Sequence, residues 1–141
     1  MSIAVIYWSG TGNTEAMAQA VEEGAKSTGA ETILLPSAAF DASMMSQYDA
    51  IAFGCPAMGA EVLEESEFEP MFTACLPELS GKTIALFGSY GWGDGEWMRQ
   101  WEDSCTNAGA RLACDSVICC GYPDDDAVDG CKKLGAALAH E

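Results

Sequence analysis

Positive charge is scarce in this sequence. The chain of 141 residues contains 6 Lys and Arg against 22 Asp and Glu, which gives a formal net charge of −16. Proteins that bind nucleic acids need a basic surface to displace counterions from phosphates. Proteins that dock on anionic membranes also rely on Lys and Arg. The composition therefore argues against both kinds of partner.

Long hydrophobic runs are missing as well. The first apolar stretch ends at Ser9 and follows no basic segment, and no run approaches the ~18 residues of a membrane-spanning helix. We therefore expect a cytoplasmic protein. The hydrophobic fraction of 49% is too high for a disordered acidic tail. At ~150 residues per domain, residues 1–141 are predicted to form one domain.

The sequence also lacks pairs of metal-binding residues at the spacing typical of a metal site. The chain has seven cysteines, no Cys-x-x-Cys pair and a single histidine, His140. A structural zinc site usually takes four such ligands in closely spaced pairs. The adjacent Cys119 and Cys120 would point to opposite faces of a strand. We therefore predict no metal, and thiols that are reduced and buried as small hydrophobes.

The sequence does contain apolar runs that alternate with helical patterns. Five runs read as strands buried on both faces: 3–8, 32–35, 50–54, 83–88 and 117–120. Apolar residues recur at helical spacing after most of these runs. After the first run they are Met17, Ala20, Val21, Gly24 and Ala25, and after the last run they are Cys131, Leu134, Gly135 and Leu138. The segment 37–47 is only weakly helical. The pattern predicts an α/β fold, a doubly wound parallel sheet that binds its ligand beyond the carboxyl ends of the strands.

The loop after the first strand is rich in glycine and short polar residues, Ser9-Gly10-Thr11-Gly12-Asn13-Thr14. Glycine lets successive N–H groups point into one hollow, and the following helix adds its own free N–H groups. The loop lacks the lysine of a Walker A motif and the third glycine of the dinucleotide fingerprint. An ordinary strand–helix connection is the alternative, but the position after the first strand favours a phosphate cradle without a cation.

Large side chains stand in the loops after the third and fourth strands. Met58 follows Cys55-Pro56-Ala57, and Trp92 stands within Ser89-Tyr90-Gly91-Trp92-Gly93-Asp94-Gly95. Met58 is also a common gap filler, and Trp92 could instead pack over a neighbouring helix. Taken together, the two side chains predict the walls of a slot for a flat ring system.

At these loops the sequence resembles the short-chain flavodoxins of anaerobic bacteria. The matching strings are Tyr7 through Thr14, Met58-Gly59 with Glu61 through Phe68, and Gly88 through Gly95. The resemblance implies a flavodoxin-like five-stranded sheet of order 2-1-3-4-5 with helices on both faces. It also implies a low-potential one-electron carrier, not an enzyme, that uses the semiquinone/hydroquinone couple of non-covalently bound FMN.

The resemblance also implies roles for individual residues. The loop 9–14 would hold the FMN phosphate, Met58 and Trp92 would cover the two ring faces, and Glu61 would accept the flavin N3–H. The Gly59–Ala60 peptide would change orientation with redox state. The expected cofactor-binding residues are Ser9, Gly10, Thr11, Gly12, Asn13, Thr14, Pro56, Ala57, Met58, Gly59, Ala60, Glu61, Ser89, Tyr90, Gly91, Trp92, Gly93, Asp94 and Cys119.

Two residues depart from the family pattern. Pro56 removes a backbone N–H where relatives often have a small hydroxyl residue, which predicts weaker FMN binding. Ala60 replaces Asp or a similar polar residue, and it accepts a left-handed backbone less readily than Gly or Asn. We therefore expect a less stabilised semiquinone than in relatives.

Other functions of related folds fit the sequence less well. A response-regulator receiver needs an acidic cluster after strand one and a phosphorylatable Asp after strand three, where this chain has 9–14 and 55–58. An FMN-dependent NAD(P)H:quinone-type oxidoreductase needs a second pocket and usually a longer chain.

The acidic residues in 61–69, with Asp94, Glu96 and 124–126, predict a negative rim that attracts basic redox partners transiently. We expect the protein to be a monomer.

Overall fold

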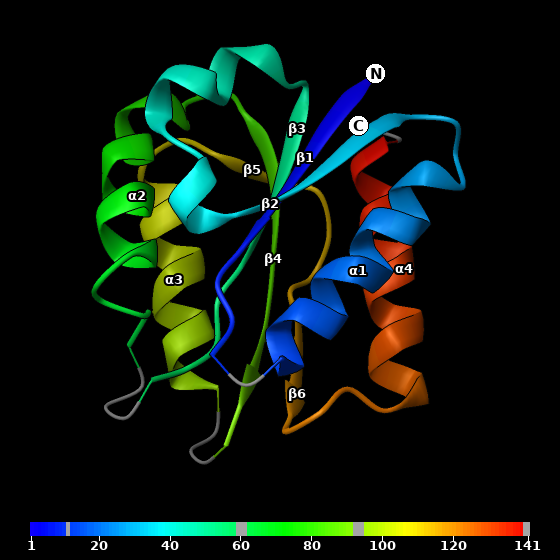
Figure 1. Ribbon diagram of the computed structural model, residues 1–141. Coiled ribbons are helices and arrows are strands. Elements are labelled where there is room, and N and C mark those ends of the chain that lie inside the picture. Colours follow the sequence, from blue (N-terminus) through cyan, green and yellow to red (C-terminus); the bar gives the residue numbers. More distant parts are fainter. Residues whose placement is uncertain (11, 59–61, 92–94, 140–141) are drawn as a thin grey trace.

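The computed structural model describes residues 1–10, 12–58, 62–91 and 95–139, which form one parallel sheet between two layers of helices (Figure 1). The strands are β1 (Ser2–Tyr7), β2 (Glu31–Pro36), β3 (Ala50–Gly54), β4 (Thr83–Tyr90), β5 (Arg111–Leu112) and β6 (Val117–Cys120). The helices are α1 (Asn13–Lys26), α2 (Phe68–Cys75), α3 (Glu96–Asn107) and α4 (Asp125–Ala139). The order β2-β1-β3-β4-β5, with β6 also on β4, confirms the predicted fold class.

The fifth position of the sheet holds two short strands. Arg111 of β5 pairs with Thr83 at the start of β4, and Cys119 of β6 pairs with Ser89 near its end. Only β6 was predicted, because a two-residue strand is too short to show periodicity. The prediction of burial on both faces is confirmed for β3 and for most of β1 and β4. It is wrong for β2 and β6, which lie at the sheet edges and contain only half-buried and exposed residues.

Helices α1 and α4 cover one face of the sheet and contact each other along their length (Figure 1). Two glycines allow their backbones to approach. A Cβ added at Gly24 would lie 2.0 Å from the Lys132 carbonyl oxygen, and one added at Gly135 would lie 2.1 Å from that of Val21. Both glycines are buried, in agreement with the predicted core stripes.

The opposite face is covered by α2 and α3 (Figure 1). Aromatic rings pack between these helices and the sheet. Phe72 meets Phe53 of β3 edge to face, with ring centroids 5.1 Å apart. Trp101 of α3 meets Phe68 in the same manner, at 5.4 Å. Edge-to-face pairs add stability beyond the area that they bury. This packing holds α2 and α3 against the sheet.

The weakly helical crossover consists of two short 3-10 helices, η1 (Ser37–Ala39) and η2 (Ala42–Gln47), as its sequence indicated. Asp41 caps η2 by accepting the Ser43 N–H at 2.9 Å. Lys82 then ties the end of η2 to β4, because its ammonium donates to the carbonyl oxygens of Met45 (3.0 Å) and Tyr48 (2.7 Å). Satisfying these carbonyls replaces the hydrogen bonds that a longer helix would supply.

All seven cysteines are free thiols. Four are buried as predicted: Cys55, Cys75, Cys105 and Cys131. The prediction is wrong for Cys120, which is exposed, while Cys114 and Cys119 are half-buried. Cys120 is exposed because β6 lies at the sheet edge, where successive side chains alternate between packed and open faces.

Two further properties concern the described part of the chain. None of its helices has the length and apolar character needed to cross a membrane. In that same part, no three His, Cys, Asp or Glu residues come together in a way that could hold a metal ion.

Candidate functional site

A hollow of about 280 Å³ opens at the carboxyl ends of β1, β3 and β4. The chain leaves β1 toward β2 on one side and later adds β3 on the other, so the order of strands reverses here. This is the place where a ligand was expected. The residues that line the hollow are Trp8, Ser9, Gly10, Asn13, Thr14, Pro56, Ala57, Met58, Ser89, Tyr90, Gly91 and Gly121.

The loop between β1 and α1 forms one wall. Gly12 precedes the helix with φ of 93°, a left-handed conformation that favours glycine, and its N–H donates to the Ser9 hydroxyl oxygen at 3.0 Å. The Ser9 hydroxyl hydrogen is therefore left to donate elsewhere. A Cβ on Gly10 would lie 3.0 Å from the indole of Trp8, so the ring of Trp8 lies over this turn.

Thr14 presents a buried hydroxyl with no partner. Its side chain is 1% exposed, and its Oγ1 accepts or donates no hydrogen bond. Thr14 and the half-buried Asn13 stand at the N-terminus of α1, whose free N–H groups and dipole favour an anion. No Lys or Arg is among the described residues that line the hollow. These neutral donors and the unmet hydrogen bond of Thr14 fit a phosphate group.

The segment after β3 forms the second wall. Pro56, Ala57 and Met58 line the hollow, and the Ala57 N–H donates to the Ser89 carbonyl oxygen at 3.0 Å, which fastens this segment to the end of β4. The Met58 N–H donates to the carbonyl oxygen of Val62 at 2.8 Å, so the chain turns back on itself. Met58 is half-buried and supplies a polarizable surface to the hollow.

The end of β4 and the loop after β6 close the third side. The Ser89 hydroxyl donates to the Gly121 carbonyl oxygen at 2.5 Å, and the Gly121 N–H donates to that of Tyr90 at 2.9 Å. Tyr90 packs against Trp97 of α3, with ring centroids 5.6 Å apart. Trp8 and Gly121 were not predicted as site residues. Trp8 reads as the end of a strand, and for the region of Gly121 the resemblance implied only that the loop following Cys119 closes one end of the site.

The structure brings together most of the described residues that the sequence predicted. Those on the hollow are Ser9, Gly10, Asn13, Thr14, Pro56, Ala57, Met58, Ser89, Tyr90 and Gly91. Gly12 and Cys119 do not line it: Gly12 caps α1, and the Cys119 sulfur lies 3.6 Å from the Met17 sulfur. The remaining predicted residues lie outside the described part of the chain: Thr11, Gly59, Ala60, Glu61, Trp92, Gly93 and Asp94.

A buried carboxylate holds the end of the second wall. Glu64 is 5% exposed, and its two oxygens accept the backbone N–H groups of Ser66 (2.8 Å), Glu67 (2.7 Å) and Phe68 (2.8 Å), as well as the Ser66 hydroxyl. Burial alone raises its pKa, but these hydrogen bonds outweigh burial and lower the pKa to about 2. Glu64 therefore caps the start of α2 as an anion.

We predict that Glu64→Gln destabilises the protein by about 1–2 kcal/mol at pH 7, because an amide nitrogen would face N–H donors. The carboxyl pKa is lower in the folded chain than its ordinary 4.5, so the stabilisation is complete above pH 4.5 and is lost as pH falls toward 2. Urea unfolding at pH 7, 4 and 2.5 should show the gap to wild type closing. A gap independent of pH would contradict the assignment, and the exposed Glu65→Gln serves as control.

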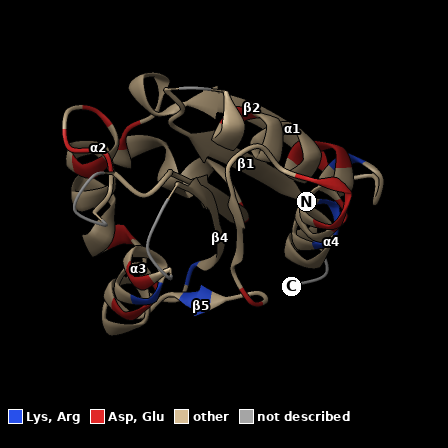
Figure 2. Ribbon diagram, turned by 90° about the horizontal axis from the view of Figure 1, so that it is seen from below, with Lys and Arg blue, Asp and Glu red and all other residues tan. Residues whose placement is uncertain are grey.

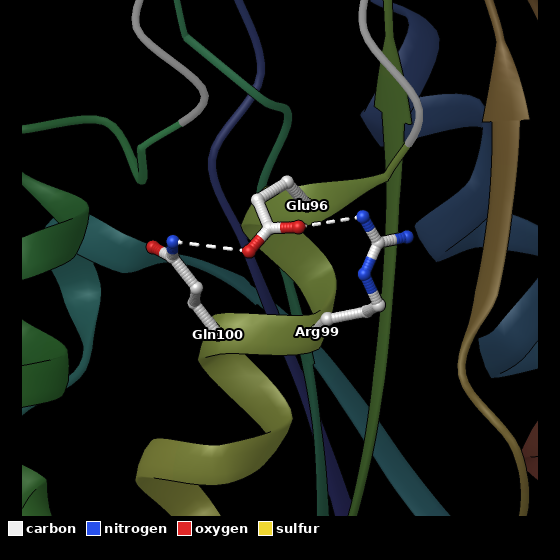
Figure 3. Close-up of polar contacts among 3 residues, drawn as sticks. All are labelled: Glu96, Arg99 and Gln100. Atoms are coloured by element: carbon white, nitrogen blue, oxygen red, sulfur yellow. Dashed lines mark hydrogen bonds and ion pairs between the residues drawn. The ribbon is translucent and has the colours of Figure 1, made fainter.

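The predicted negative rim needs one correction. Glu96 at the start of α3 is bonded on both sides, to Arg99 at 2.6 Å and to Gln100 at 3.3 Å (Figure 3). Its charge is therefore largely balanced locally. Glu65, Glu67 and the three residues 124–126 are exposed and appear in no ion pair that joins described residues. Figure 2 shows Asp and Glu on several helices and only a few segments with Lys or Arg.

Comparison with known proteins decides the family. The family model for flavodoxin matches residues 5–135. The chain belongs to the flavodoxin family. It is 43% identical to the flavodoxin of Megasphaera elsdenii over 137 residues, which cover 97% of this chain and 98% of that one. It is 40% identical to the flavodoxin of Clostridium beijerinckii, with 96% and 98% covered.

Solved flavodoxin structures agree with this membership. The solution structure of two-electron reduced M. elsdenii flavodoxin superimposes with a TM-score of 0.91 and covers 99% of both chains. Flavodoxins bind FMN and transfer electrons without being enzymes, so this chain is an FMN-bound electron carrier. The NAD(P)H-dependent oxidoreductase is not favoured.

Proposed function

We propose that the chain carries single electrons at low potential, with the FMN phosphate held in the hollow at the start of α1. The observation that carries this proposal is the Thr14 hydroxyl, which is buried without a partner on the wall of a hollow whose described lining includes no Lys or Arg. Ser9, Asn13 and the free N–H groups of α1 would complete the set of donors. Bound FMN supplies the one-electron chemistry that the side chains lack.

The rest of the hollow would hold the ring system. Met58 and Tyr90 offer apolar surfaces, and the fixed turn at Gly121 limits the opening on the side of β6. Trp92 and Glu61, which lie outside the described residues, are proposed on the family resemblance to stack on the ring and to accept its N3–H. Cys119 is proposed to contribute through its backbone, because its side chain is directed to Met17.

The charge distribution favours a low potential. Glu64 remains ionised near the second wall, and the described residues of the hollow include no Lys or Arg to offset its charge. A negative charge about 10 Å from an added electron, at an effective dielectric constant of about 20, costs about 1.7 kcal/mol, or about 70 mV. Solvent screening reduces this value for exposed carboxylates. The negative charge of the protein therefore disfavours the reduction of the FMN semiquinone to the hydroquinone, which lowers the potential of this couple.

The test is a titration of the apoprotein with FMN and, in parallel, with riboflavin. We expect one FMN per chain with flavin absorbance, and riboflavin binding that is about 100-fold weaker because several charge-assisted hydrogen bonds are lost. Equal affinities would contradict the phosphate cradle. An anaerobic redox titration of the complex then measures the potential, and a value no lower than that of free FMN would contradict the electrostatic effect.

We propose basic proteins as transient redox partners of a monomeric chain. Next to the hollow, exposed Ile118 and Tyr122 share a second depression with Asp124 and Asp126, beyond the turn at Gly121. Such an apolar centre with an acidic edge suits a weak, small interface.

The free state of all seven thiols supports a reducing compartment, which we infer to be the cytoplasm.

The acidic surface predicts opposite salt effects with two acceptors. Oxidation of the reduced protein by cytochrome c, a basic acceptor, should slow about tenfold between 20 and 200 mM salt, because screening removes attraction. Oxidation by ferricyanide, an anion, should accelerate over the same range. Stopped-flow absorbance measures both rates. Rates that do not change with salt for either acceptor would eliminate electrostatic steering.

A further inference from the structure

The thiol of Cys55 connects two distant points of the second wall. Cys55 follows β3 directly, is 0% exposed, and its sulfur accepts the Glu64 N–H at 3.3 Å, from nine positions further along the chain. The same thiol donates to the carbonyl oxygen of Pro56 at 3.5 Å. A neutral thiol can do both. Burial raises its pKa to about 12, so it stays neutral and unreactive at pH 7.

The described chain between these two points includes the part of the wall that faces the cofactor hollow. It begins with Pro56, Ala57 and Met58, which line the hollow, and Met58 pairs with Val62 on the way back. The contact between Cys55 and Glu64 closes the base of this turn. Beyond it, the Glu64 carboxylate caps the start of α2. A change at the base would therefore move Met58 relative to the hollow.

The backbone of Cys55 gives the thiol a fixed support. Its N–H donates to the Phe87 carbonyl oxygen at 3.2 Å, and its carbonyl oxygen accepts the Trp97 indole N–H at 3.3 Å. A Cβ on Gly88 would lie only 2.2 Å from that carbonyl oxygen, so β4 is pressed against it. The position of the sulfur is thus set by β4 and α3. The Glu64 N–H is buried and would have no partner without the sulfur.

We propose that Cys55 is a positioning residue of the cofactor site, whose thiol holds the described ends of this turn, residues 56–58 and 62–63, in the positions that place Met58 against bound FMN. This proposal rests on the proposed function, because it assumes that FMN occupies the hollow. Cys55 does not touch the reacting atoms. It acts through Glu64 at one end of the turn and Pro56 at the other.

The test compares three variants. Cys55→Ala removes the acceptor, Cys55→Ser restores one, and Cys131→Ala deletes an equally buried thiol of α4, on the other face of the sheet. Hydrogen exchange measured by NMR on the apoprotein should show about fivefold less protection of the Glu64 amide in Cys55→Ala. The FMN dissociation constant should rise about tenfold and the visible circular dichroism of bound flavin should change. Cys55→Ser should recover most of the amide protection, the FMN affinity and the flavin spectrum, and Cys131→Ala should alter none of the three.

Several outcomes would overturn the proposal. One is a wild-type Glu64 amide that exchanges as fast as an exposed amide. Another is a Cys55→Ala variant that loses stability as Cys131→Ala does but keeps the FMN affinity and flavin spectrum of wild type. If Cys55→Ala does not fold, Cys55→Val removes the same acceptor without leaving a cavity and is judged identically. Failure of the wild-type chain to bind FMN would instead refute the proposed function, while the exchange data still report on the thiol.

Discussion

Replacing Gly135 with alanine is expected to destabilise the fold by about 3 kcal/mol or more. The new Cβ would lie 2.1 Å from the Val21 carbonyl oxygen and 2.8 Å from the Ala25 nitrogen, both of them backbone atoms of α1. Backbone atoms cannot rotate away as side-chain ends do, so α4 would have to move off α1. The midpoint of urea unfolding should fall strongly, while the slope of the transition stays unchanged.

Gly130 provides the matched control within the same helix. A Cβ there would meet the Val117 side chain at 3.5 Å, an ordinary van der Waals distance. Gly130→Ala should therefore stabilise the protein by about 0.5–1 kcal/mol through helix propensity. Gly24→Ala, on the other side of the same helix contact, should resemble Gly135→Ala. Similar effects at Gly130 and Gly135 would show that the helices do not meet at this point.

These glycines also show how far the sequence leads. Spacing alone placed Gly24 and Gly135 on the buried sides of their helices, and both are buried. Spacing does not reveal that the two residues lie in one contact between α1 and α4, since that depends on how elements far apart in the chain are packed. The break between β5 and β6 escaped prediction for a related reason, because Arg111 pairs with β4 without any apolar pattern of its own.

The site was predictable where its residues are neighbours in sequence. Ser9, Gly10, Asn13 and Thr14 line the hollow together because one short loop joins a strand to a helix, and glycine and polar residues are typical of such a turn. Contacts between distant segments gave no local signal. The loop after Cys119 was implied by the resemblance alone, and the bond by which Ser89 of another strand holds the turn at Gly121 could be recognised only in three dimensions.

The net charge follows from the composition, but the partners of individual carboxylates do not. Composition gives a net charge of −16, yet it does not show that Glu96 is balanced by Arg99 while Glu64 is buried and capped by N–H groups. Both carboxylates lie near helix starts, where negative charge is favoured. Their different partners give them different roles: Glu64 fixes the second wall, whereas Glu96 contributes little to the rim.

The Thr14 hydroxyl predicts opposite effects on stability and on cofactor binding. Thr14→Val keeps the shape and the β-branched character of the side chain in α1, but it removes the buried hydroxyl that has no partner. The apoprotein should therefore gain about 1 kcal/mol of stability, because an unsatisfied buried polar group is costly. The FMN dissociation constant should rise about 10- to 100-fold, because a hydrogen bond to a charged phosphate is lost.

Ser37 separates the two effects. Its hydroxyl is also buried without a partner, at 2% exposure, but it does not line the cofactor hollow. Ser37→Ala should increase the stability of the apoprotein without changing FMN affinity, as measured by urea unfolding and flavin fluorescence titration. Thr14→Val should weaken FMN far more than riboflavin, which has no phosphate. If Thr14→Val weakens the binding of both flavins equally, the hydroxyl acts on the ring or through the fold. If it weakens the binding of FMN alone, the Thr14 hydroxyl, which has no partner in the free protein, is the group that recognises the phosphate.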